Sequence, residues 1–162
     1  NPNQGTELVI RAHGHSPELK LRITAWGTAK NRLHESERLV PGNYTSLEYC
    51  FQEAWRECKS NCVSIGDAIN KAEKTLEEVK ADIILEEIPK LLEDKPKSAN
   101  NADFRKAVFA KNEDYQKALE HLHKLEALLA HFEGHMKTME NTCRYLKKQM
   151  DYFIRSGVVE RR

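Results

Sequence analysis

The chain has 162 residues, of which 40% are hydrophobic and 31% are charged, and its formal net charge at pH 7 is +1. This length allows one domain, or one domain with an appendage, and the apolar content is enough for a thin core. The apolar runs are only a few residues long, which excludes a membrane-spanning helix, and we expect no membrane partner.

The charge is unevenly distributed along the chain. Basic residues outnumber acidic ones by six to four in residues 1–46 and by thirteen to nine in residues 97–162, whereas acidic residues lead by twelve to seven in residues 47–95. Basic ends around an acidic middle indicate either contact with a polyanion or subunits that pack end to middle. Solvated helix faces that happen to be uneven are the alternative explanation.

Residues 1–44 predict a small β-hairpin followed by a polar connection. Two stretches, Glu7–Ala12 and Leu19–Trp26, have the alternating pattern of strands, and the turn-forming residues 13–17 join them. A two-stranded hairpin is marginal by itself. We therefore expect it to pack on helices or to extend a sheet of another subunit.

Residues 45–157 predict two long helices, whose apolar residues recur in alternating steps of three and four. Such steps without a slip are typical of the seam of a coiled coil. The first seam ends near Pro89, which cannot continue a regular helix. Its positions are Leu47, Phe51, Ala54, Cys58, Cys62, Ile65, Ile69, Ala72, Leu76, Val79 and Ile83. The second seam consists of Tyr115, Ala118, Leu122, Leu125, Leu129, Phe132, Met136, Met139, Cys143, Leu146, Met150 and Phe153.

A short polar connection, residues 90–101, makes the two helices antiparallel neighbours. The predicted fold is therefore mainly α: a long antiparallel helical hairpin, coiled-coil-like, with a small N-terminal β-hairpin and a basic tail over residues 158–162. Asn112 either separates a short preceding helix from the second long helix or sits exposed on one continuous helix.

The second helix is predicted to extend past the first at its C-terminal end. From about Arg144 onward the seam continues without a partner in the same chain. We therefore expect the chain to form a homo-oligomer. The subunit contacts and the ligand-binding surface are both expected at that end of the helix.

The four cysteines are predicted to be reduced, as in a cytoplasmic protein. Cys58 and Cys62 occupy apolar seam positions, and the second CX3C motif of a twin CX3C protein is missing, since only Cys50 and Cys143 remain. A secreted helical protein with disulfides and a glycosylated Asn43 is a third, less favoured hypothesis.

No enzyme signature is present: the sequence has no phosphate-binding glycine loop, no nucleophile elbow and no HExxH motif. We predict a non-enzymatic protein without a cofactor or metal. The best metal candidate is the pair His131 and His135, but one helix face offers two ligands where zinc requires four. Surface histidines are the favoured interpretation.

Two groups of cations point to nucleic acid. Cations that follow phosphates beside an aromatic side chain that stacks on a base are how single strands are held without sequence preference. The first group surrounds Trp26 and consists of Arg11, Lys20, Arg22, Lys30 and Arg32. The second lies on the second long helix and consists of Arg144, Lys147, Lys148 and Arg155. The alternatives are that Trp26 covers the apolar side of the hairpin, and that the second group serves the helix dipole or an acidic partner subunit.

A helix that begins Phe104-Arg105-Lys106 is followed by the second long helix and by an ending that contains Phe153 and Gly157. In this arrangement, residues 47–157 resemble T4-type phage recombination mediator proteins. The first long helix, from Leu47, is similar in placement, whereas the N-terminal hairpin does not fit the pattern. The resemblance implies an oligomeric helical protein that binds single-stranded DNA and helps load a recombinase, in the host cytoplasm if the chain is phage-encoded. The main alternative is a helical protein–protein scaffold or adaptor with no nucleic-acid role.

Overall fold

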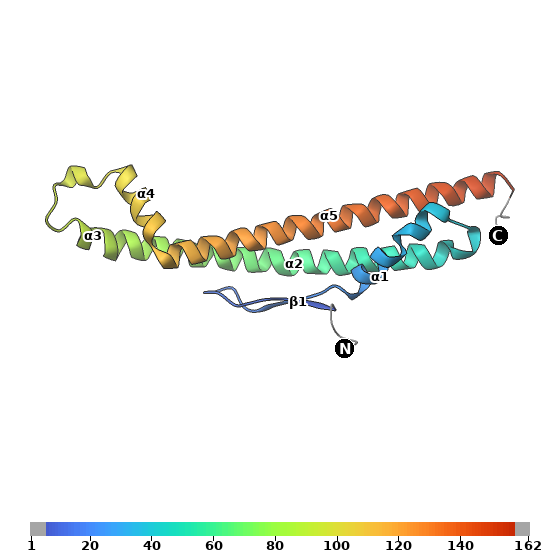
Figure 1. Ribbon diagram of the computed structural model, residues 1–162, viewed down its shortest axis with the longest axis horizontal. Helices are drawn as coiled ribbons and strands as arrows, with labels where there is room; N and C mark the ends of the chain where they lie inside the picture. The colour runs from blue at the N-terminus through green and yellow to red at the C-terminus, as the bar shows by residue number, and fades with distance from the viewer. Residues whose placement is uncertain (1–5, 158–162) are drawn as a thin grey trace. The chain divides into compact units, whose positions relative to one another are not determined.

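The computed structural model describes residues 6–157, so the predicted basic tail lies outside the described residues. The fold is mainly helical, with a small antiparallel N-terminal sheet, which confirms the predicted fold class (Figure 1). Within these residues no helix has the length and apolar character to cross a bilayer. The strands and α-helices are β1 (Glu7–Ile10), β2 (Leu19–Arg22), α1 (Thr24–Arg32), α2 (Tyr44–Asp82), α3 (Ile88–Leu91), α4 (Ala102–Lys111) and α5 (Glu113–Arg155).

The chain divides into two compact units, and each contains part of both long helices. Among the described residues, unit 1 comprises residues 6–9, 20–64 and 129–157, and unit 2 comprises residues 10–19 and 65–128. Every seam position predicted on the two long helices is buried or half-buried, so the predicted seams are confirmed.

The core of unit 1 joins the first part of α2 to the last part of α5. Leu47 and Phe51 of α2 are fully buried in one cluster with Met139 and Leu146 of α5. Leu39, from the segment between α1 and α2, belongs to the same cluster. The prediction that the seam beyond Arg144 lacks a partner in its own chain is therefore wrong, because the first part of α2, α1 and the segment between them all contribute to the core that contains Leu146.

In unit 1 the second strand is shorter than predicted, because it ends at Arg22 and α1 begins at Thr24. Two side chains of α2 explain the change of conformation. Asn61 Nδ2 donates to the Arg22 carbonyl at 2.7 Å. The Glu57 carboxylate accepts from the first free backbone N–H groups of α1, those of residues 25 and 26, at 3.0 Å each. A carboxylate at this end of a helix satisfies orphan donors and complements the helix dipole.

In unit 2 the helical run that contains α2 passes through Pro89 and ends at Leu91, close to the predicted end near Pro89. A π-helical turn, Ile83–Glu87, leads from α2 into α3, and the Ile88 N–H donates to the Ile83 carbonyl. A proline ring clashes with the carbonyl four residues earlier in a regular α-helix, and the wider turn relieves that clash. Ile83, the first residue of the turn, and Ile88, the first residue of α3, are both buried. They form one core cluster with Val108 of α4.

Asn112 ends α4 and caps α5, so the short helix and the long one are separate. Its Oδ1 accepts from the Tyr115 N–H and its Nδ2 donates to Glu87 Oε2, each at 2.8 Å. The side chain thus replaces a missing intrahelical bond and ties the start of α5 to the π-helical turn.

Candidate nucleic-acid interface

The first predicted group of cations is only partly brought together. In unit 1, Lys20 and Arg22 are exposed on β2 and share a surface pocket with Arg56 of α2. Glu53 and Glu57 line the same pocket, so its charge is mixed. A pocket of mixed sign is a weak attractor for a polyanion.

Trp26 does not stand beside these cations on a strand face, because it lies in α1 and packs toward α5. Its ring stacks on the His135 ring with centroids 3.7 Å apart, and it is half-buried against the core of unit 1. His135 Nε2 in turn lies 2.9 Å from His131 Nε2. One face of the indole is therefore occupied, which favours the packing interpretation of Trp26 over base stacking.

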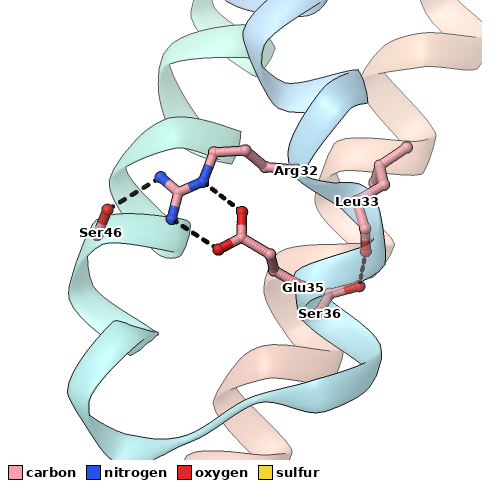
Figure 2. A network of polar contacts seen from close by, with 5 residues as sticks. All are labelled: Arg32, Leu33, Glu35, Ser36 and Ser46. Atoms are coloured by element: carbon pink, nitrogen blue, oxygen red, sulfur yellow. Dashed lines mark hydrogen bonds and ion pairs between the residues drawn. The ribbon is translucent and has the colours of Figure 1, made fainter.

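Arg32 is held within unit 1, as Figure 2 shows. Its Nε donates to Glu35 Oε2 at 2.7 Å and its Nη1 donates to Ser46 Oγ at 2.9 Å. The hydrogen bond from the guanidinium lowers the pKa of the Glu35 carboxyl below its usual value. Three of the five guanidinium N–H groups are thereby engaged within the fold.

The remaining two cations of the first group are both exposed. Lys30 lies on α1 in unit 1. Burial lowers the pKa of His135, and Lys30 is close enough for its charge to lower that pKa further. Arg11 belongs to unit 2. In unit 1 the first group therefore has an aromatic ring, Trp26, with one face already covered by His135.

The second group of cations is presented to solvent by the last part of α5. Arg144, Lys147, Lys148 and Arg155 are all exposed, and no ion pair within residues 6–157 involves any of them. The burial of Met139 and Leu146 on the opposite side of the helix fixes this orientation.

Two tyrosines lie among these cations, and the sequence interpretation did not include them. Tyr145 is 45% exposed and Tyr152 is 65% exposed. Residues three, four and seven apart lie on the same side of a helix, which places both rings beside the cations. We call this surface the tyrosine–cation face; its members are Arg144, Tyr145, Lys148, Tyr152 and Arg155. The sequence did carry a signal, because both tyrosines fall outside the three-and-four seam of α5.

The helix dipole explains only part of this face. Cations complement the negative end of a helix within its last turn. Arg155 is the last residue of α5 and fits that role. Arg144 and Lys148 lie two to three turns earlier, where the helix dipole does not account for them.

Within residues 6–157 no three His, Cys, Asp or Glu side chains converge as a metal site. His131 and His135, the candidate pair, contact each other, and the His135 ring also stacks on Trp26. All four cysteines are free thiols, and burial raises the pKa of Cys58 to about 12. A thiol with such a pKa stays protonated and packs as a small apolar side chain.

Comparison of the chain with protein-family models, with curated proteins and with solved structures gives no match.

Proposed function

We propose that the chain is a non-enzymatic protein that binds single-stranded DNA through the tyrosine–cation face of α5. The observation that carries the proposal is the combination on that face of exposed cations without ion pairs and two exposed phenol rings. Cations that follow the phosphates and aromatic rings that stack on bases hold a single strand without reading its sequence.

The resemblance of residues 47–157 to phage recombination mediators extends this proposal. It adds a homo-oligomer, in which weak faces of several subunits act together, and a recombinase as partner. The four free thiols support a reducing compartment, so we assign the protein to the cytoplasm, that of the host cell if a phage encodes the chain.

The test is a charge reversal on the tyrosine–cation face. We expect the double variant Arg144→Glu, Lys148→Glu to bind a labelled single-stranded oligonucleotide at least about tenfold more weakly at low salt. Each phosphate contact to a single strand contributes about 0.7 to the slope of log K against log salt, so the slope should fall by about 1.4. Fluorescence anisotropy over a salt series measures both quantities.

The matched control reverses the charge of two exposed lysines in another part of the chain. Lys111→Glu, Lys124→Glu alters two residues of unit 2 and should leave the slope close to that of the wild type. Circular dichroism checks that each variant keeps its helix content. Absence of binding by the wild type at low salt, or an equal loss in both double variants, would contradict the proposal.

A scaffold or adaptor is the second candidate, and one surface of unit 2 favours it. Ile84, Leu85 and Leu91 are exposed by 48%, 74% and 47%, an unusual density of large apolar side chains on a surface; we call them the apolar patch. Ile84 also lines a groove with Phe109 and Tyr115. If the wild type assembles but binds no oligonucleotide at low salt, the scaffold function is favoured instead.

A further inference from the structure

A groove between α2 and α5 in unit 1 opens beside the tyrosine–cation face. It has a volume of about 490 Å³ and shares Arg144 with that face. We call it the α2–α5 groove; its lining includes Trp55, Arg56, Met139, Glu140, Cys143 and Arg144. Its volume lies within the range of small-ligand sites, so a single nucleobase fits it.

The floor of the α2–α5 groove is apolar and contains a flat ring. Met139 is fully buried, whereas Trp55 and Cys143 are half-buried and reach the surface. Burial raises the pKa of the Cys143 thiol, which keeps it neutral. The Lys59 ammonium lies over the Trp55 ring at 5.8 Å from its centroid, and because this side chain is long and exposed, it moves aside when a nucleobase stacks on the indole.

One polar group at the groove has unused hydrogen-bonding capacity. The Trp55 Nε1–H donates to Glu140 Oε1 at 2.8 Å, which orients the ring and the carboxylate together. Within residues 6–157, the second oxygen of Glu140 takes part in no hydrogen bond. A carboxylate only accepts, so it selects a ligand that donates.

The cations at the rim fit the phosphates on either side of a base. Arg144 forms no ion pair within residues 6–157. Arg56 pairs with Glu53, but both side chains are more than 40% exposed, and an exposed pair exchanges partners at little cost. The groove therefore combines an aromatic ring, a carboxylate acceptor and two flanking cations, and the amide of Gln52 also lines it.

On the basis of the proposed function, we propose that the α2–α5 groove holds one base of the bound strand and prefers cytosine to thymine. The N4 amino group of cytosine donates to the free oxygen of Glu140, as carboxylates accept from that group elsewhere. Thymine offers a carbonyl at the same position, which would face the carboxylate and repel it. The two pyrimidines have similar size and stacking surface, so the difference between them isolates the contact with Glu140.

The experiment compares labelled dC and dT oligonucleotides of equal length with the full chain at neutral pH and low salt. We expect the wild type to bind the dC strand about tenfold more tightly, the scale of one hydrogen bond to a charged group. In Glu140→Gln the ratio should fall to about 1, because the amide offers a donor as well as an acceptor. The Gln oxygen still accepts from Trp55, so the ring should keep its orientation.

Glu126→Gln is the matched control, since it removes the same charge from an exposed position of α5 in unit 2. It should keep the wild-type preference for dC. Equal affinities of the wild type for both strands, or a preference that survives in Glu140→Gln, would overturn this inference while leaving the proposed function intact. If neither strand binds at low salt, the proposed function fails, and the inference with it.

Discussion

Gly14 occupies a position that no other residue fits well. Its φ is +55°, and a Cβ atom built there would lie 2.3 Å from Thr75 Cγ2 and 2.5 Å from Thr75 Oγ1. The neighbouring His15 N–H donates to the same Thr75 Oγ1 at 2.9 Å, and its ring pairs with Glu78. The turn between the two strands is thereby attached to α2 within unit 2, and the attachment depends on the absence of a side chain at residue 14.

We expect Gly14→Ala to lower the free energy of unfolding by more than the roughly 1–2 kcal/mol that a positive φ costs an L-residue, because the clash with Thr75 adds to it. Gly66→Ala is the control, since Gly66 lies inside α2 with nothing within 4 Å of its added Cβ. That change should instead stabilise the chain by about 0.5–1 kcal/mol. Urea denaturation followed by circular dichroism measures both, and similar effects of the two changes would contradict this account.

Single residues also show why the two cation groups differ. Trp26 has a stacking partner in His135 and Arg32 is held by Glu35 and Ser46, so both are committed to the fold. Tyr152 is 65% exposed and its neighbours on the helix are cations. Residue type alone does not distinguish an aromatic that packs from one that remains free to bind.

At the scale of elements, α1 is attached to α5 through a stack of aromatic rings. Trp26 of α1 stacks on His135 of α5, and the His135 ring contacts that of His131. Burial lowers the pKa of His135, and the charges of His131 and Lys30 lower it further. The attachment is therefore strongest when His135 is neutral.

A pH dependence of stability follows from this arrangement. Because the pKa of His135 is lower in the folded chain, the unfolded chain binds the proton first, and the free energy of unfolding falls as the pH drops below about 6.5. We expect the urea midpoint, followed by tryptophan fluorescence, to fall between about pH 7.5 and about pH 5.5. The fall should be smaller in His135→Gln.

His123→Gln serves as the control, since His123 is exposed on α5 in unit 2. It should show the same fall as the wild type. A fall of equal size in His135→Gln and in the wild type would mean that other groups carry the dependence; His121, whose pKa burial also lowers, is the first to consider.

At the scale of the whole molecule, the seams of both long helices are satisfied within the chain, so an oligomer must use other surfaces. The apolar patch of unit 2 (Ile84, Leu85 and Leu91) is the leading candidate, because burying such side chains contributes about 25 cal/mol per Å² of apolar area. Ile84 and Leu85 lie in the π-helical turn and Leu91 is the last residue of α3, so two of the three side chains are presented by the irregular turn.

We expect the wild type to sediment at micromolar concentration as a multiple of one chain, and Leu85→Glu to shift it toward a single chain. Leu85 is 74% exposed, so the change should leave folding intact. Val63→Glu, at a position of unit 1 that is 67% exposed, is the control and should not alter the mass. A wild-type mass equal to one chain would contradict the predicted oligomer.

The sequence by itself determined the two long helices and which of their residues face inward. Steps of three and four depend only on the local geometry of an α-helix, and every seam position from Leu47 to Phe153 is buried or half-buried as that rule requires. The sequence also indicated that Tyr145 and Tyr152 are exposed, because both lie outside the seam of α5.

Only the tertiary structure decided three features of the fold. These are the residue at which β2 ends, the segments that cover the end of α5, and which aromatic side chain is exposed, Tyr152 and not Trp26. The start of α1 depends on Glu57 and Asn61, which lie more than thirty residues away in sequence. The burial of Leu146 depends on the segment after α1 that contributes Leu39 to the same core. These outcomes rest on contacts between residues distant in sequence, and periodicity within one element carries no information about such contacts.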